Sequence, residues 1–188
     1  MRIILIISVI IFAIIYAFSK TKAETNEKYI VLEIINNIEI RQYESTINAI
    51  YYSKEDKARN NYFKILASYI FGENNKNESI SMTSPVTMRL HGNKEMLFRM
   101  PDKYNLENLP KANNTDIKFT KISSCIKAAI KYSGYSNNNI EQKKITELKE
   151  ILQEKNISHD SKFEILVYNS PYKVLNRRNE ITVNVTYP

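Results

Sequence analysis

Short segments rich in β-branched and aromatic residues recur along most of the chain and are bounded by polar or turn-forming residues. Such segments are typical of β-strands. A Gly-Asn pair at 92–93 separates two of them and predicts a tight hairpin. The strands that this pattern predicts cover residues 29–35, 38–44, 46–52, 85–91, 95–101, 116–122, 125–133, 163–169 and 180–187.

Two other segments carry their apolar residues at helical spacing. Residues 54–72 have acidic residues near the start and Gly72 as a stop signal. Residues 137–156 form an amphipathic pattern with one apolar face. That face consists of Ile145, Leu148, Ile151 and Leu152. The order strand–helix–strand–strand therefore occurs twice, which predicts an α+β fold with an antiparallel sheet and two covering helices.

The first predicted helix has an unusually wide apolar face. At 100° per residue, about half of its circumference is apolar, whereas a helix on a core needs a stripe of about 100°. Phe63 and Ala67 lie on the surplus side, with Arg59 and Asn60 one to two turns earlier and Lys64 at the border. Two interpretations remain open. The helix is simply well buried, with Arg59 extending to solvent, or Phe63 and Ala67 hold a flat apolar ligand whose carboxylates pair with cations at the edge.

The N-terminus has the pattern of an export signal. Residues 3–18 are an apolar run preceded by Arg2 and followed by small and polar residues. The run falls short of the about 20 residues of a typical membrane span. We expect residues 1–23 to be a signal peptide or an N-terminal membrane anchor. The body would then be exported, as a periplasmic, otherwise extracytoplasmic or secreted protein, with a membrane tether through residues 3–18 if they are retained.

Composition narrows the function classes. The net charge of +7 is spread along the chain, and no nucleic-acid-binding module is recognisable, so we expect no nucleic-acid partner. Cys125 is the only cysteine, which excludes an intramolecular disulfide and leaves no Cys/His metal spacing. His91 adjoins the predicted turn at 92–93, and His159 lies in the connector between the second helix and the next strand. Either could ligate iron, but solvated loop histidines are the favoured interpretation. No nucleophile elbow, phosphate loop or paired-histidine motif is present, so we predict a non-enzymatic protein with no catalytic residues and no protein-ligated metal.

Four stretches together resemble the SOUL haem-binding protein family. The resemblance extends over the body of the chain, residues 28–188, and implies a distorted antiparallel β-barrel made of two β-α-β-β repeats with two helices packed outside. It also implies non-covalent binding of haem or a related porphyrin. The stretches are YIVLEIINNIEIRQYE (29–44), ISMTSPVTM (80–88), FRMPDKYNLENLPKANN (98–114) and YNSPYKVLNRRNEITV (168–183).

The resemblance also implies a site. In the family, haem lies in a shallow apolar groove between the first helix and the loop before the last strand. The positions carried over to this chain are Asn60, Phe63, Ala67, Ser68 and Lys173. Phe63 and Ala67 would form the floor, while Arg59, Lys64 and Lys173 would pair with the propionates and Tyr172 would offer a ring face. Asn60 and Ser68 stand where basic residues are usual in the family.

Two further expectations concern the loop and the function. The run Arg177-Arg178-Asn179-Glu180 either clamps the loop to the body through charge-assisted hydrogen bonds, which we favour, or contacts the ligand. The predicted function is haem binding for transport, buffering or scavenging. The alternatives are a binding module for another hydrophobic ligand or protein partner on the same fold, and a membrane-tethered structural protein.

Overall fold

A computed structural model describes residues 28–54, 59–170 and 172–188. The predicted signal peptide or anchor, residues 1–23, lies outside this part. The strands are β1 (Tyr29–Ile35), β2 (Ile38–Tyr43), β3 (Thr46–Tyr51), β4 (Val86–Arg89), β5 (Met96–Arg99), β6 (Lys118–Ile122), β7 (Cys125–Tyr132), β8 (Glu164–Val167) and β9 (Asn179–Asn184), and the helices are α2 (Arg59–Ile70) and α3 (Asn138–Glu154). Every strand predicted from the sequence is confirmed, with bounds that differ by at most a few residues.

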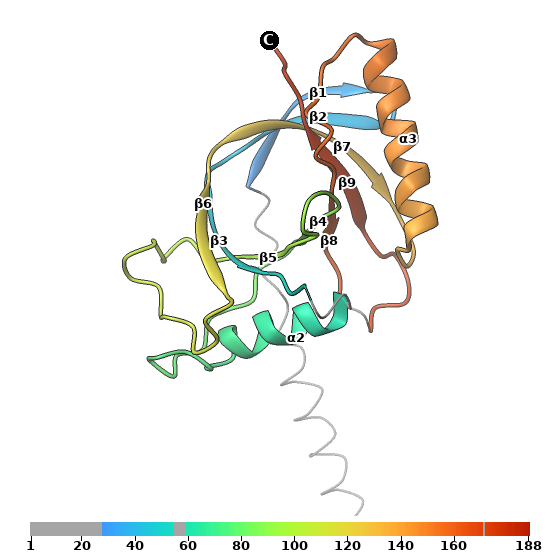
Figure 1. The fold of residues 1–188 in the computed structure, drawn as a ribbon. Helices are drawn as coiled ribbons and strands as arrows, with labels where there is room; N and C mark the ends of the chain where they lie inside the picture. The colour runs from blue at the N-terminus through green and yellow to red at the C-terminus, as the bar shows by residue number, and fades with distance from the viewer. Residues whose placement is uncertain (1–27, 55–58, 171) are drawn as a thin grey trace, which may run out of the picture.

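All nine strands belong to one antiparallel sheet (Figure 1). Their spatial order is β1-β2-β7-β9-β8-β4-β5-β3-β6, so neighbours in the sheet are mostly distant in sequence. The sheet curls strongly, but no pairing joins β1 to β6 among the residues that the structure describes. The predicted α+β class is therefore confirmed, whereas the predicted closure into a barrel is not.

The order of the strands contains a repeat. The unit β3-α2-β4-β5 places its strands in the order β3-β5-β4, and the unit β7-α3-β8-β9 places its strands in the matching order β7-β9-β8. The two units meet where β4 pairs with β8. The strand before each unit joins the other unit, since β2 pairs with β7 and β6 pairs with β3. These exchanged strands connect the two halves into one sheet.

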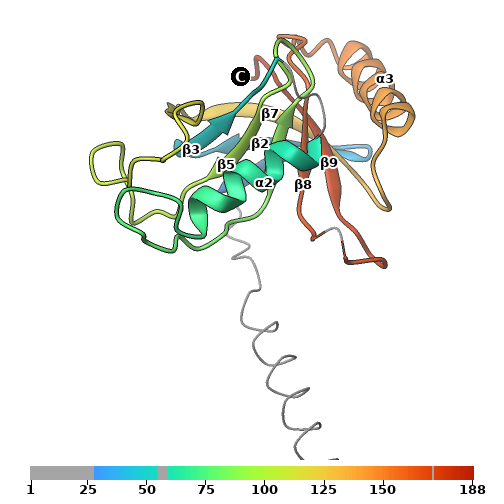
Figure 2. The same cartoon turned by 60° about the horizontal axis from the view of Figure 1, so that its bottom comes forward.

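The two helices cover equivalent strands of their own halves. Helix α2 packs on β3 and β5, and α3 packs on β7 and β9 (Figure 2). Between helices and sheet lies the apolar core, to which α2 contributes Tyr62, Leu66, Ala67, Tyr69 and Ile70. The predicted apolar face of α3 is confirmed, because Ile145, Leu148 and Leu152 are buried and Ile151 packs at the edge of the core.

Local chemistry fixes the ends of these elements. Asn137 is the N-cap of α3, and its side chain accepts a hydrogen bond from the Ile140 backbone amide at 3.0 Å. Gly92 has a φ of 54° in the predicted β4–β5 hairpin, a backbone conformation that favours glycine. No helix in residues 28–54, 59–170 or 172–188 is both long enough and apolar enough to span a membrane.

Candidate functional site

The predicted floor of the groove is packed against the protein body. Ala67 is buried, and the Phe63 ring is half-buried and meets the Phe98 ring edge-on, with 5.3 Å between the ring centroids. Asn60 and Lys64 are exposed on the outer side of α2. The wide apolar face of this helix is therefore used mainly for the core, which was the plainer of the two interpretations.

Arg59 links the two helices, because its side chain pairs with an acidic residue of α3. Its guanidinium donates to both carboxylate oxygens of Glu141 in α3, at 2.6 and 2.8 Å. Burial alone would raise the pKa of Glu141, but the hydrogen bonds from Arg59 and their charge outweigh it and hold the pKa below the ordinary value. Arg59 thus neutralises a buried carboxylate, an arrangement that favours a structural role over the predicted pairing with propionates.

The predicted clamp of the C-terminal loop is confirmed. We define this loop as residues 168–170 and 172–178, between β8 and β9. Arg177 is buried, and its guanidinium donates to the backbone carbonyl oxygens of Ser170 at 2.7 Å and Lys173 at 2.8 Å. The flat face of the same guanidinium lies over the Tyr135 ring, with Cζ 4.5 Å from the ring centroid. A single cation therefore holds the loop in one conformation from within.

The base of the loop is fixed by a buried charged network. Glu180 accepts from Arg41 at 2.6 and 3.1 Å, from Arg178 at 2.9 Å and from the Tyr168 hydroxyl at 2.9 Å. Arg41 and Glu180 are both fully buried. Burial, together with the adjacent Glu180 carboxylate, raises the pKa of Tyr168 well above its ordinary value, so this phenol stays a hydrogen-bond donor.

The tip of the C-terminal loop is apolar and exposed. Tyr172 is 89% exposed, Val174 68% and Leu175 77%. Lys173 is exposed between them. Tyr172 and Lys173 were predicted as site residues, but Val174 and Leu175 were not. The sequence did contain a signal for these two residues. Both are apolar, and both fall between the predicted strands 163–169 and 180–187, where no core position was expected.

A chain of contacts connects the first turn of α2 with the C-terminal loop. Glu141, the partner of Arg59, also accepts from the Ser136 hydroxyl at 2.9 Å. The preceding residue, Tyr135, is the one that stacks on Arg177. Asn60, Lys64, Tyr172 and Lys173 are thus exposed on two elements that these contacts link indirectly, while Phe63 and Ala67 lie on the core side of α2.

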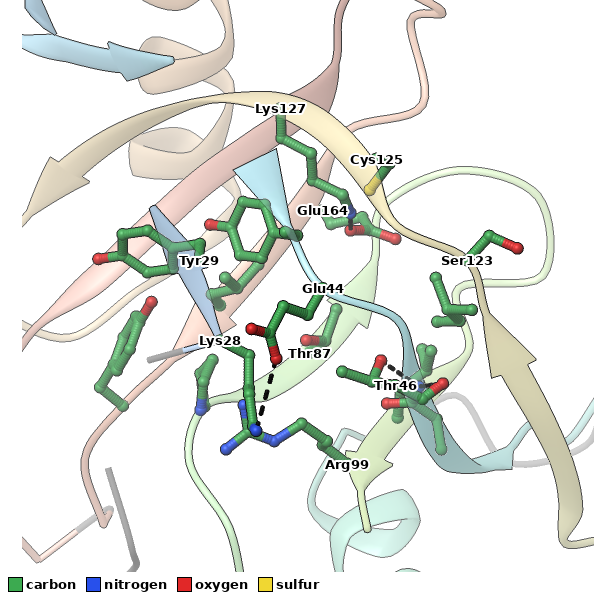
Figure 3. A pocket seen from close by; sticks show the side chains of 17 residues that line it. Lys28, Tyr29, Glu44, Thr46, Thr87, Arg99, Ser123, Cys125, Lys127 and Glu164 are labelled. Carbon is green, nitrogen blue, oxygen red and sulfur yellow. Dashed lines mark hydrogen bonds and ion pairs between the residues drawn. The ribbon is translucent and has the colours of Figure 1, made fainter. Parts of the chain in front are cut away.

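A separate pocket of about 90 Å³ lies on the other face of the sheet (Figure 3). Residues alternate between faces along a strand, and in β8 it is Glu164 and Leu166 that line the pocket while Ile165 and Val167 face the helices. Its walls come from both halves of the sheet. They include Lys28, Tyr29, Tyr43, Glu44, Thr46, Asn48, Thr87, Leu97, Arg99, Cys125, Lys127 and Tyr168. Sequence reasoning missed this pocket because its walls are assembled by the pairing of strands that are distant in sequence.

The charged groups of this pocket are largely paired with one another. Lys127 lies 2.5 Å from Glu164, and Lys28 lies 3.5 Å from Glu44, as Figure 3 shows. Lys28 also pairs with Asp102, outside the pocket, at 2.6 Å. Burial raises the pKa of the Cys125 thiol, so it is protonated at neutral pH and is a poor nucleophile. Sites for drug-sized ligands usually have about 300–1,000 Å³. The pocket therefore suits a small molecule and not a porphyrin.

The histidines and acidic residues of the described part of the chain form no cluster. Within the described ranges, no three side chains of His, Cys, Asp or Glu are grouped closely enough to hold a metal ion. His91 lies in the β4–β5 turn. The Nδ1 atom of His159 accepts from the Ser161 backbone amide at 3.1 Å, and its ring packs on Phe163. His91 thus adjoins the predicted turn, and His159 lies in the predicted connector, where it forms an isolated β-bridge with Val185.

The chain is similar in sequence to a known protein family and to a human protein. The model of the SOUL heme-binding protein family matches residues 24–184. Heme-binding protein 2 of Homo sapiens is 28% identical over 135 residues, which are 67% of this chain and 65% of the human protein.

Solved structures share the fold at low identity. The EcmrR C-terminal domain has a TM-score of 0.61 at 9% identity and covers 82% of this chain and 100% of its own. A protein described as a hydrolase from Listeria innocua has a TM-score of 0.55 at 8% identity, over 82% of this chain and 94% of its own. At these identities the structures support the fold and not a function. The match to the family model extends over most of the chain, and the protein belongs to the SOUL heme-binding protein family.

Proposed function

We propose that this protein binds haem or a related tetrapyrrole non-covalently, without catalysing a reaction on it. The observation that carries the proposal is the family match over residues 24–184. The human relative is named for heme binding, and its match to this chain spans 65% of the human protein. Transport, buffering or scavenging of the porphyrin outside the cytoplasm is the role we propose, since residues 3–18 have the pattern of an export signal or anchor.

The surface between the first turn of α2 and the tip of the C-terminal loop is the proposed binding site. A porphyrin needs an apolar contact surface and cations for its two propionates. Val174 and Leu175 supply exposed apolar contacts, and Tyr172 supplies a ring face. Lys64 and Lys173 are exposed cations on the two elements. Arg59 supports the site indirectly, by holding the start of α2 on α3.

A haemin titration followed by Soret absorbance tests this proposal. We expect saturable one-to-one binding, weakened about tenfold by Lys173→Glu, which is the effect of losing one ionic contact of about 1.4 kcal/mol. Lys111→Glu is the matched control, because Lys111 is also exposed but lies in the 102–114 connector. Absence of a saturable Soret change would refute haem binding. An equal effect of both substitutions would remove Lys173 from the site.

The pocket on the other face of the sheet favours a second candidate function, the binding of a small organic molecule. The cavity is already open in the structure, with no side chain that has to move. Its walls combine tyrosine rings with Leu97, Leu166 and paired charges. A thermal-shift screen with small apolar carboxylic acids and amines tests this function. Leu166→Trp would fill the cavity, so a stabilising compound must lose its effect in that variant. A shift that survives in Leu166→Trp would place the compound elsewhere.

A further inference from the structure

The tip of the C-terminal loop exposes more apolar surface than the fold requires. Tyr172, Val174 and Leu175 are three large side chains within four residues, and each is more than two-thirds exposed. Contiguous exposed apolar groups of this kind mark sites of contact with a partner or a membrane. Among the described residues, Tyr172, Val174 and Leu175 neither belong to the apolar core nor pack against it.

The exposure of the tip is built into the loop. Arg177 occupies the inside of the turn and binds the carbonyl oxygens of Ser170 and Lys173. The Lys173 backbone amide in turn donates to Ser170 at 3.0 Å. With the interior filled by a guanidinium, the apolar side chains of the tip are directed outward. In Figures 1 and 2 the loop projects beyond the body at the edge of the molecule.

The chain enters the fold beside the base of this loop. Arg178 donates to the Tyr29 hydroxyl at 3.0 Å, and Tyr29 is the first residue of β1. Only Lys28 separates Tyr29 from residues 1–27, which contain the apolar segment 3–18. A body tethered to a bilayer through that segment would hold its β1 entry, and with it the loop, close to the lipid surface.

The chemistry of the tip matches the headgroup region of a bilayer. Tyrosine is favoured at the boundary between headgroups and acyl chains, and lysine extends its ammonium to the headgroups from an inserted backbone. Lys173 lies between Tyr172 and Val174, and the whole chain carries a net charge of +7. Anionic lipids attract such a surface.

We propose that the tip, residues 172–175, inserts shallowly into the surface of an anionic phospholipid bilayer. Val174 and Leu175 enter the acyl boundary, Tyr172 lies at the interface, and Lys173 contacts anionic headgroups. The inference does not depend on haem binding, although membrane contact would place the proposed haem site where lipophilic porphyrins accumulate. Both properties can be tested separately, because the vesicle experiment below contains no haem.

The absence of tryptophan from the chain allows a direct test. Leu175→Trp and the control Leu106→Trp each introduce a single tryptophan at an exposed leucine. The chain of 188 residues is incorporated into vesicles of phosphatidylcholine and phosphatidylserine with brominated acyl chains. Leu106 is 51% exposed and belongs to the connector of residues 102–114. In Figure 1 this connector lies on the opposite side of the molecule from the loop. Any contribution of residues 1–27 to membrane binding is the same in both variants.

We expect a blue-shifted emission and several-fold stronger quenching for Leu175→Trp than for Leu106→Trp. Adding Lys173→Glu to Leu175→Trp should reduce the quenching on vesicles that contain phosphatidylserine and leave it unchanged on pure phosphatidylcholine. Equal quenching at both tryptophans, or none at position 175, overturns the proposal. In the second case the tip would be a surface for a protein partner or for the porphyrin alone.

Discussion

The β4–β5 and β8–β9 hairpins occupy equivalent places in the two halves of the sheet but differ in construction. The first is closed by residues 90–95, and the second by residues 168–178. No large hydrophobic residue of the first connection is among the most exposed of the described residues, whereas the second exposes three. Equivalent strands therefore carry a minimal turn in one half and an elaborated loop in the other.

The two connections are also stabilised by different means. The short one uses left-handed backbone at Gly92 and Lys94, with a partly exposed ion pair between Arg89 and Glu95. The long one uses a buried cation, Arg177, inside the loop, and a buried carboxylate, Glu180, at its base. Buried polar groups are costly unless they are satisfied, and loops commonly carry function. The difference indicates that the second connection is the specialised one.

The largest expected effect comes from the charged network at the base of the long loop. Arg41→Met removes two hydrogen bonds from the buried Glu180 carboxylate and should lower the free energy of unfolding by about 3 kcal/mol. Arg89→Met, at the short hairpin, removes the partly exposed pair with Glu95 and a longer contact of 3.7 Å with Glu164, which keeps Lys127, and should cost about 1 kcal/mol. Urea denaturation of both variants measures the difference, and equal losses would contradict the contrast between the two hairpins.

Removing the ion pair between the helices should lower the free energy of unfolding by a smaller amount, and this amount should depend on pH. Glu141→Gln weakens the link between the two halves, and we expect a loss of about 2 kcal/mol at pH 7. The pKa of Glu141 is lower in the folded state than in the unfolded chain. Its contribution is therefore present above the unfolded pKa and is lost as the pH falls through the folded pKa.

Urea midpoints measured between pH 7 and pH 3 test this sign. The difference between the wild-type protein and Glu141→Gln should shrink as the solution is acidified. A difference that stays constant over this range would mean that the Glu141 charge does not stabilise the fold.

A smaller and local effect is expected from Arg177→Ala. The substitution removes the hydrogen bonds to Ser170 and Lys173 and should cost about 1 kcal/mol, mostly as disorder of the loop. Amide hydrogen exchange should become faster at Lys173, whose amide bonds within the loop. Exchange in residues 90–95 should stay unchanged. Accelerated exchange in both hairpins would indicate a global loss of stability instead.

The sequence predicted the elements well because their signals are local. Strand composition, the Gly-Asn turn at 92–93 and the apolar face of 137–156 each need only neighbouring residues. The clamp by the arginines of the long loop was also predicted, since charged side chains in a turn between strands must find partners nearby. The resemblance to a family correctly predicted the membership of the chain.

The rest depends on contacts between segments that lie far apart in the sequence. The pairing of Arg59 with Glu141 joins the starts of the two helices, and nothing in either segment indicates the partner. Whether the sheet closes depends on its two outermost strands, β1 and β6, and periodicity does not determine this. The pocket beside Glu164 is likewise made by strands from both halves.

The smallest expected effect on stability is at the apolar tip itself. Val174→Ser and Leu175→Ser change side chains that are 68% and 77% exposed, so the free energy of unfolding should change by less than about 0.5 kcal/mol. Met88→Ala, in the β4 strand next to the short hairpin, is the contrast, because this buried side chain should cost about 2–5 kcal/mol. If the tip variants keep full stability but lose haemin or vesicle binding, the apolar residues serve a ligand. If they destabilise the protein as Met88→Ala does, the tip packs on the body in solution and both proposals for its surface fail.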